Sequence, residues 1–302
     1  MCALTPRVRS ACRGTEAMAA WRKLGVIAGG GELPVVLAEH CAATGRPYFV
    51  TRIAPYADAS LGAHPGVVHG LGLMGARMAA LREAGCDAVV MLGQVPRPDL
   101  GALELDDGAR AMIPALLAAL PNGDDALLRA VLSEFERNGF RVLGVEEVMS
   151  DLLAQLGAWG SHAPNDKHLR DVKLGARAAA AIGAFDIGQG VVACDGLILA
   201  VEAQEGTDKM LHRVGELPTT VRGNAEQRRG VLVKRPKPIQ ERRIDLPTIG
   251  VRTIERAAAA GLAGVAVEAG AALAVRRDEI IAAADAASMF VYGFSPGEVG
   301  ET

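Results

Sequence analysis

The sequence predicts an α/β protein with two domains, an N-terminal Rossmann-like domain with a parallel sheet and a C-terminal α/β domain with a mixed sheet. Three observations carry this prediction. The chain has 302 residues, enough for two hydrophobic cores, and half of its residues are hydrophobic. Apolar strand patterns alternate with helical patterns over residues 23–144, as in parallel sheets. Residues 152–165 lose this periodicity and collect Gly, Pro, Ser and Asn, which indicates a connection between domains.

These observations predict the domain boundaries. Residues 21–155 form the N-terminal domain, residues 156–165 the linker and residues 166–302 the C-terminal domain. Residues 1–20 carry Arg but neither a core pattern nor the apolar run of a secretion signal. We expect them to be a disordered extension, or the result of a start codon assigned too far upstream.

In the N-terminal domain, short apolar runs predict strands and longer periodic runs predict helices. A helix is also expected to open at Asp124-Asp125, where two carboxylates favour the positive N-terminal end. The expected strands are 23–28, 48–52, 88–92 and 140–144, and the other expected helices are 35–44 and 73–84.

In the C-terminal domain, an apolar pair around Cys194-Asp195-Gly196 predicts a hairpin of strands 191–193 and 197–201. The other expected strands are 231–233, 263–268, 271–275 and 289–293, and the expected helices are 166–181, 251–260 and 280–287.

Composition excludes several classes of protein. The net charge is −3 and aromatic residues make up 4% of the chain, which argues against a nucleic-acid groove and its stacking platforms. No run of 18 apolar residues predicts a membrane-spanning helix. The five Cys residues form no CxxC pair, which favours reduced thiols in a cytosol over a disulfide scaffold or a zinc ribbon.

A glycine turn, Gly29-Gly30-Gly31, separates the first strand from the first helix. Such a turn at a helix N-terminus suits a phosphate or a nucleotide. The dinucleotide fingerprint is not met, because Leu33 and Pro34 occupy its last spacing and the second strand ends in Arg52 rather than an acid. A tight structural turn, a nicotinamide site and a site for another nucleotide stay open at this point.

A second candidate, Gly93-Gln-Val-Pro-Arg-Pro98, follows a predicted parallel strand at the edge where open α/β sheets bind ligands. Arg97 stands between two prolines, which stiffen its backbone for a phosphate or base contact. The alternative is a rigid loop with a surface arginine.

Two charged segments follow strands of the C-terminal domain. Glu202 ends one apolar strand and precedes Asp208, and Lys234 ends another and opens a proline-restrained loop to Asp245. Carboxylates and cations without a His cluster suggest Mg²⁺- or Mn²⁺-assisted phosphoryl chemistry, and no Walker P-loop is present. A solvated helix start at Glu202–Asp208 and a structural loop at 234–250 are the alternatives.

The motifs resemble one family over residues 23–293. The chain is similar to the LpxI-type UDP-2,3-diacylglucosamine pyrophosphatases of bacterial lipid A synthesis. The motifs that carry the resemblance are residues 24–34, Leu92-Gly-Gln-Val-Pro-Arg-Pro98, Gly123-Asp-Asp-Ala-Leu-Leu128, Asp186-Ile-Gly-Gln-Gly190, residues 200–208 and residues 230–250.

The resemblance implies hydrolysis of UDP-2,3-diacylglucosamine to UMP and 2,3-diacylglucosamine 1-phosphate (lipid X) with a divalent metal. It also implies a homodimer, with the substrate held between the domains. From it we expect a cytoplasmic protein with peripheral contact to the inner membrane, no nucleic-acid partner, and a C-terminal domain that carries catalysis and binds the lipid.

The resemblance and the charged segments together give the candidate site residues. Glu241 stands where Asp is common in the family, which weighs against a direct role for that position. Catalytic roles are expected for Asp245, Lys234 and Arg243, and Mg²⁺ or Mn²⁺ ligation for Asp245, Glu202 and Asp208. Substrate contacts are expected for Gly29, Gly30, Gly31, Leu33, Pro34, Gln94, Arg97, Gln189, Thr207, Lys237 and Thr248.

These residues predict a division of labour between the domains. The uridine is expected toward Gly29–Gly31 and Gln94–Arg97, the pyrophosphate near Asp245, and the acyl chains within the C-terminal domain. A non-catalytic nucleotide-lipid binding protein is the main alternative, and a nicotinamide oxidoreductase is a third.

Overall fold

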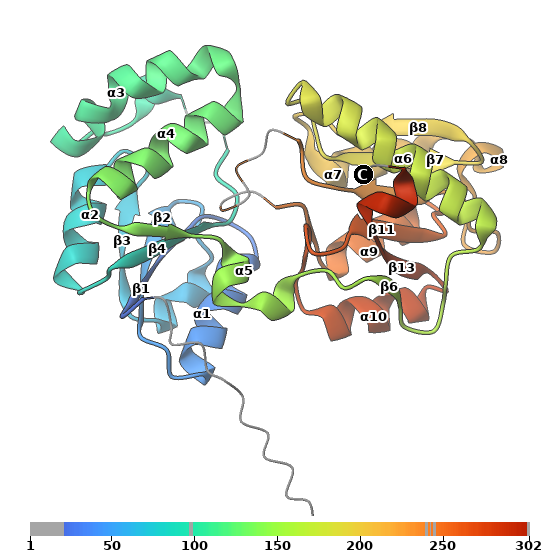
Figure 1. Ribbon diagram of the computed structural model, residues 1–302, viewed down its shortest axis with the longest axis horizontal. Coiled ribbons are helices and arrows are strands. Elements are labelled where there is room, and N and C mark those ends of the chain that lie inside the picture. The colour runs from blue at the N-terminus through green and yellow to red at the C-terminus, as the bar shows by residue number, and fades with distance from the viewer. Residues whose placement is uncertain (1–20, 97–98, 239–240, 242, 244–245, 301–302) are drawn as a thin grey trace, which may run out of the picture.

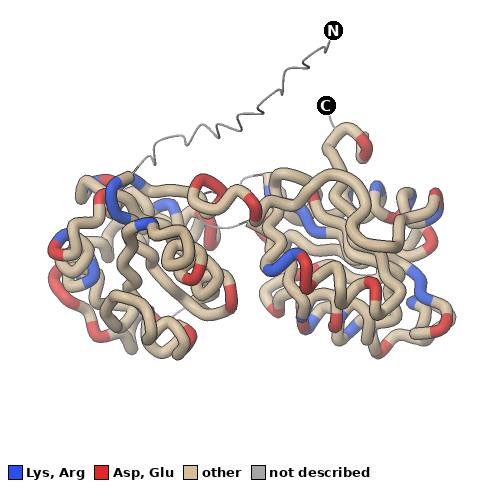
Figure 2. The backbone as a smooth tube through the Cα atoms, turned by 90° about the horizontal axis from the view of Figure 1, so that it is seen from below, with Lys and Arg blue, Asp and Glu red and all other residues tan. Residues whose placement is uncertain are grey.

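The computed structural model describes residues 21–96, 99–238, 241, 243 and 246–300, and it divides into two α/β domains that lie side by side (Figure 1). The predictions for residues 1–20, Arg97 and Asp245 lie outside the described residues. Figure 2 shows basic and acidic segments interspersed over both domains.

The N-terminal sheet is parallel, with the strand order β3-β2-β1-β4-β5. This order reverses direction at β1, and the carboxyl ends of β1 and β4 therefore flank the switch point where ligands bind in open α/β sheets. The strands are β1 (Leu24–Ala28), β2 (Tyr48–Ala54), β3 (Gly66–Gly70), β4 (Ala88–Leu92) and β5 (Arg141–Leu143).

Helices cover both faces of this sheet and form two apolar clusters. One cluster contains α1 and α5, and the other contains α2, α3 and α4. Both clusters bury the Val, Leu and Ile side chains of β1 and β4, which explains why these strands are uninterrupted apolar runs. The helices are α1 (Leu33–Ala43), α2 (Met74–Glu83), α3 (Asp107–Ala119), α4 (Asp124–Arg137) and α5 (Val145–Val148), with short 3₁₀ turns at Ala59–Ala63, Leu100–Ala102, Leu120–Asn122 and Ser150–Leu152.

The C-terminal sheet is mixed, with the order β6-β13-β11-β9-β7-β8. The three central strands β13, β11 and β9 are parallel, and β6, β7 and β8 pair antiparallel with their neighbours. The strands are β6 (Gly157–Trp159), β7 (Gly190–Cys194), β8 (Leu197–Val201), β9 (Val231–Lys234), β11 (Gly264–Glu268) and β13 (Phe290–Phe294). A separate two-stranded sheet pairs β10 (Thr248–Ile249) with β12 (Leu273–Ala274).

Helix α6 (Asp166–Ala184) covers one face of the mixed sheet, together with the 3₁₀ turn Pro296–Val299. The other face is covered by α7 (Gly206–Glu216), α9 (Val251–Ala259) and α10 (Arg277–Ala286), and the short α8 (Thr219–Arg222) follows α7. Among the described helices, none is both long and apolar enough to cross a bilayer.

The predicted fold class is confirmed: the N-terminal sheet is parallel and the C-terminal sheet is mixed. The segment 156–165 differs from the expected linker, because its residues 157–159 form β6 and pair with β13 of the C-terminal sheet. The sequence analysis also did not anticipate β3, α3, α5 or β10.

The two domains share an apolar contact. Leu246, Leu273 and Val275 of the C-terminal half belong to the cluster that contains α1 of the N-terminal domain. Leu153 forms an antiparallel bridge with Leu273, and Arg276 pairs with Glu32 at 2.5 Å. These contacts therefore hold the two domains together where α1 packs against the C-terminal half.

Candidate functional site

The glycine turn lies at the carboxyl end of β1 and packs against the end of β4. The Gly30 and Gln94 backbones exchange two hydrogen bonds of 2.8 Å, and the Gly29 amide donates to the Leu92 carbonyl at 2.8 Å. A Cβ on Gly29 would lie 2.9 Å from the Gln94 carbonyl oxygen, so only glycine fits there. The amides of Gly29 and Gly30 thus hold the two loops together.

Gly31 is the open residue of this turn. Its φ is +92°, and no atom lies within 4 Å of the place where a Cβ would be. Leu33 and Pro34 open α1 immediately afterwards. A ligand can therefore approach the backbone of Gly31 at the start of the helix.

A cavity of about 280 Å³ lies beside the glycine turn, at the carboxyl end of β2. Its lining includes Arg52, Pro55, Ala57 and Asp58, and the intervening Tyr56 carbonyl oxygen lies 3.0 Å from where a Cβ on Gly30 would be. This hollow belongs to the N-terminal domain.

In the C-terminal domain, Glu202, Thr207 and Lys234 form a buried polar cluster. The Thr207 hydroxyl donates to Glu202 Oε1 at 2.7 Å and accepts from Lys234 Nζ at 2.9 Å. Lys234 Nζ also donates to the Thr248 carbonyl oxygen at 3.3 Å. Glu202 is 7% exposed and Lys234 5% exposed, so both charges lie in a place largely closed to water.

Neighbouring strands bring this cluster together. Glu202 directly follows β8, and its amide donates to the carbonyl of Gly190 at the start of β7. Gly190 is in turn the register partner of Lys234, the last residue of β9. A Cβ on Gly190 would lie 2.4 Å from Glu202 Oε2, so the glycine makes room for the carboxylate.

Two groups in the cluster have hydrogen-bonding capacity that the described residues do not use. Within the described residues, Glu202 Oε2 is buried without a hydrogen-bond partner. An ammonium carries three N–H donors, and the contacts of Lys234 within the described residues take two of them. The cluster therefore combines an oxygen that can accept a hydrogen bond or bind a cation with a cation that suits a phosphate oxygen.

The loop after β9 lies at the boundary between the domains. Lys237 Nζ donates to Asp186 Oδ1 at 2.6 Å, and Asp186 Oδ2 accepts from the Asp124 amide at 3.1 Å. Asp124 is the first residue of α4 in the N-terminal domain. Lys237, a predicted substrate contact, is thus linked through Asp186 to the N-terminal domain.

Arg243 and Glu241 lie against the same helix. The Glu241 amide donates to Asp125 Oδ1 at 2.6 Å, and Arg243 pairs with Glu136 at 2.6 Å and with Glu241 at 2.9 Å. The hydrogen bond from Arg243 lowers the pKa of Glu241, and the two carboxylates raise the pKa of Arg243. Arg243 is therefore a fixed cation at the boundary, and Glu241 helps to hold it.

Other predicted site residues lie elsewhere or have simpler contacts. Asp208 pairs with Arg252 at 2.5 Å on the surface, and its side chain is 45% exposed. The Gln189 carbonyl accepts from the Arg235 amide at 3.1 Å, next to the buried cluster. The Thr248 hydroxyl donates to the Leu246 carbonyl at 3.0 Å.

The predicted metal ligands do not gather within the described residues. No three His, Cys, Asp or Glu side chains there lie together as metal ligands would. Glu202 Oε2 has the chemistry of a ligand, whereas Asp208 is engaged by Arg252, and Asp245 lies outside the described residues. The described part of the chain therefore does not by itself fit a divalent ion.

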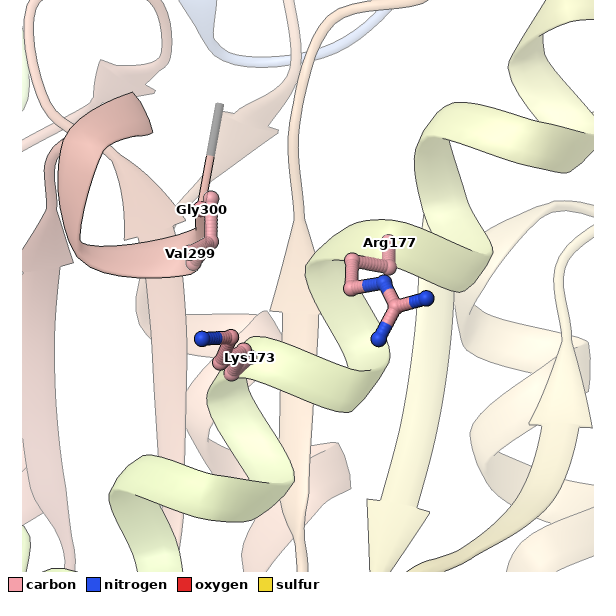
Figure 3. A pocket seen from close by; sticks show the side chains of 4 residues that line it. All are labelled: Lys173, Arg177, Val299 and Gly300. Carbon is pink, nitrogen blue, oxygen red and sulfur yellow. The ribbon is translucent and has the colours of Figure 1, made fainter. Parts of the chain in front are cut away.

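A larger cavity, of about 470 Å³, contains none of the predicted residues. It lies on the outer side of α6 and is lined by Lys173, Arg177, Val299 and Gly300 (Figure 3). Its position on α6 separates it from the carboxyl ends of β8 and β9, where the polar cluster is built.

The sequence analysis missed the acidic residues that receive the loop after β9. Asp125, Glu136 and Asp186 all contact this loop, but none was among the candidate site residues. Asp125 and Asp186 do lie in quoted motifs, each two residues from a glycine. These motifs were the available signal, because a glycine lets another segment approach the backbone closely.

Comparison with known proteins agrees with these motifs. The family model of the LpxI N-terminal domain matches residues 23–152, and that of the LpxI C-terminal domain matches residues 155–292. A protein of Caulobacter vibrioides, UDP-2,3-diacylglucosamine pyrophosphatase LpxI, is 53% identical over 277 residues, which cover 92% of this chain and 99% of that protein. With both domain models matched in order and this identity along nearly its whole length, the chain belongs to the LpxI family.

Proposed function

We propose that this protein hydrolyses the pyrophosphate bond of UDP-2,3-diacylglucosamine to UMP and 2,3-diacylglucosamine 1-phosphate. The observation that carries the proposal is the 53% identity, along 92% of the chain, to the UDP-2,3-diacylglucosamine pyrophosphatase LpxI of Caulobacter vibrioides. Because this hydrolysis belongs to lipid A biosynthesis, we propose that the protein serves that process.

The charges at the domain boundary support this reaction. Water adds across the P–O–P bridge, one P–O bond breaks, and the negative charge grows on the phosphate that leaves. Lys234, Lys237 and Arg243 are cations in or beside this region, and fixed cations stabilise such charge without reorganising. We assign them to the phosphate oxygens of the substrate.

The two domains offer different surfaces to the substrate. The open Gly31 and the 280 Å³ cavity beside its turn support a uridine site in the N-terminal domain, near Gln94. The buried cluster of Glu202, Thr207 and Lys234 supports a pyrophosphate site at the edge of the C-terminal domain. We place the acyl chains in the C-terminal domain.

A divalent metal is part of the proposal, although the described residues do not assemble its site. When bound, Mg²⁺ or Mn²⁺ would neutralise phosphate charge and lower the pKa of a bound water. Asp245 and Glu202 are the residues that we propose for its ligation. Activity should vanish in EDTA and return with Mg²⁺ or Mn²⁺, and full activity in the chelator would remove the metal from the proposal.

The test of the function is release of UMP from UDP-2,3-diacylglucosamine by the purified chain. Asp245→Ala should abolish release while substrate binding, measured by fluorescence anisotropy of a labelled analogue, survives. Substrate binding without UMP release by the wild-type chain would support a carrier instead. Release by Asp245→Ala at the wild-type rate would overturn the role of Asp245.

Dimer formation and peripheral contact with an inner membrane are further proposals, taken from the family resemblance. Light scattering of the purified protein tests the first. Flotation with vesicles tests the second.

A further inference from the structure

Asp186 has an unusual backbone and an unusual set of contacts. Its φ is +57°, in the left-handed region that costs most non-glycine residues roughly 1 kcal/mol or more. Its carboxylate lies between Lys237 Nζ at 2.6 Å and the amide of Asp124 at 3.1 Å. We call these three residues, Asp124, Asp186 and Lys237, the clasp.

Gly123 permits the clasp to form. Its φ is +96°, and a Cβ there would lie 2.5 Å from Asp186 Oδ2. The carboxylate therefore reaches the first amide of α4 only because the preceding residue is glycine. The positive end of the helix also stabilises a carboxylate in this position.

The clasp joins groups that chain connectivity does not bring together. Asp124 belongs to the N-terminal domain, and Asp186 and Lys237 reach the boundary from two separate loops of the C-terminal domain. The Lys237 and Asp186 side chains are 15% and 16% exposed, so the ion pair is partly shielded from water. A shielded ion pair fixes the position of its ammonium better than an exposed one does.

We propose that Asp186 is a positioning residue for pyrophosphate hydrolysis, which acts by holding the Lys237 ammonium at the domain boundary. The proposal rests on the proposed function. Without the carboxylate, the Lys237 ammonium would lose its 2.6 Å contact with Asp186, and its charge would be held less firmly during the reaction. Misplacing such a cation weakens stabilisation of the transition state more than it weakens binding of the substrate.

Asp186→Gly is the variant that tests this role. Glycine adopts the positive φ without strain, so the variant removes the carboxylate and leaves the backbone free to keep its path. We expect kcat for UMP release to fall roughly tenfold while KM stays within about twofold, because a charge-assisted hydrogen bond contributes about this factor. The kcat of Asp186→Asn should lie between those of wild type and Asp186→Gly. Its side-chain amide has one oxygen, which can accept from Lys237 or from the Asp124 amide but cannot replace both carboxylate oxygens.

A second background shows whether Asp186 acts through Lys237. In Lys237→Met, adding Asp186→Gly should lower kcat less than about twofold further, because residues that act as one unit are not additive. A wild-type kcat in Asp186→Gly would overturn the proposal. The same fold loss in both backgrounds would also overturn it, since Asp186 would then act independently of the lysine.

Asp195→Gly is the matched control. Asp195 is also an aspartate at positive φ, +52°, and its carboxylate also has two partners, the cations Lys167 and Arg229. It lies in the β7–β8 turn, within the C-terminal domain. Its variant should keep kcat and KM within about twofold of wild type even if the melting temperature falls. A tenfold loss of kcat here would show that the assay reports general damage and would overturn the assignment.

Amide exchange separates this proposal from the proposed function. If the wild-type chain releases no UMP, the proposed function fails, and the clasp can still be measured. Exchange of the Asp124 amide hydrogen should be faster in Asp186→Gly than in wild type and unchanged in Asp195→Gly. An Asp124 amide that exchanges equally fast in wild type and Asp186→Gly would overturn the clasp itself.

Discussion

Replacing Thr207 by Val should destabilise the C-terminal domain, because the Thr207 hydroxyl links two buried charges. The side chain keeps its shape but loses the hydrogen bonds to Glu202 at 2.7 Å and from Lys234 at 2.9 Å. Hydrogen bonds to charged groups contribute about 1.5–3 kcal/mol each, so two give an upper limit of about 6 kcal/mol. Thr207 is only half-buried, and water will replace part of the loss. We expect a loss of about 3 kcal/mol in the free energy of unfolding, or roughly 10 °C in melting temperature.

The two tryptophans allow a domain-specific assay of this prediction. Trp21 lies in the N-terminal core and Trp159 in the C-terminal core. In a Trp21→Phe background, urea unfolding followed by fluorescence reports Trp159 alone. Thr207→Ser keeps the hydroxyl and should stay within about 1 kcal/mol of the parent.

Thr220→Val is the surface control, since Thr220 is exposed and, within the described residues, only its backbone carbonyl accepts a hydrogen bond. A parental unfolding midpoint for Thr207→Val would refute the reasoning. Equal destabilisation by Thr207→Ser and Thr207→Val would refute it as well, because packing and not the hydroxyl would then be responsible.

Three further predictions follow from burial and from the shared core. Burial and the hydrogen bond to Glu298 raise the pKa of Tyr292 to about 12. The contribution of Tyr292 to the free energy of unfolding should therefore be lost as pH rises from about 10 to 12. Urea titrations should show a smaller loss of stability over this pH range in Tyr292→Phe than in wild type. Burial raises the pKa of Cys41 and Cys86 to about 11, so mass spectrometry should find both unlabelled by iodoacetamide at pH 8 unless urea is added. The two domains expressed separately should each release no UMP, and an isolated C-terminal domain that works at the full rate would contradict the shared site.

The sequence predicts the strongly apolar strands well, because burial on both faces leaves an uninterrupted pattern. Strands β1 and β4 are of this kind, and each is followed by a glycine turn. Strand β3 was missed because its half-exposed sequence, Gly-Val-Val-His-Gly, has little apolar signal. Strand β6 has three residues and takes its place only through pairing with β13, which a local pattern does not contain.

Helix α3 shows a different limit. Pro114 lies inside it, and proline in a periodic segment normally argues against a helix. The segment is nevertheless helical, because α3 packs its Ala109 and Met112 against the cluster formed by α2 and α4. Tertiary burial here outweighs the local signal.

The sequence predicts which charged residues stand at the ends of apolar strands, but it does not predict which of their side chains contact one another. Glu202 and Lys234 were selected because charges that end apolar strands meet at an edge, and the structure joins them through Thr207. Asp208 lies in α7 rather than at a strand end, and its side chain pairs with Arg252 on the surface. Asp186 escaped notice because its partners lie 62 and 51 residues away in the chain.

The domain boundary has two unlike sides, and this difference bears on how the site can work. On one side, Leu246, Leu273 and Val275 are buried in the cluster around α1, and separating them would expose apolar surface at about 25 cal/mol per Å². On the other side, the contacts that cross the boundary are polar, namely the Asp124–Asp186 hydrogen bond and the Arg243–Glu136 pair, and water can replace such contacts more easily than it can cover apolar surface. A relative movement of the domains would therefore keep the apolar side closed and open the polar side. Two of the cations that we assign to the substrate's phosphates, Lys237 and Arg243, lie on this polar side, so a movement of this kind would change their positions more than that of the buried Lys234.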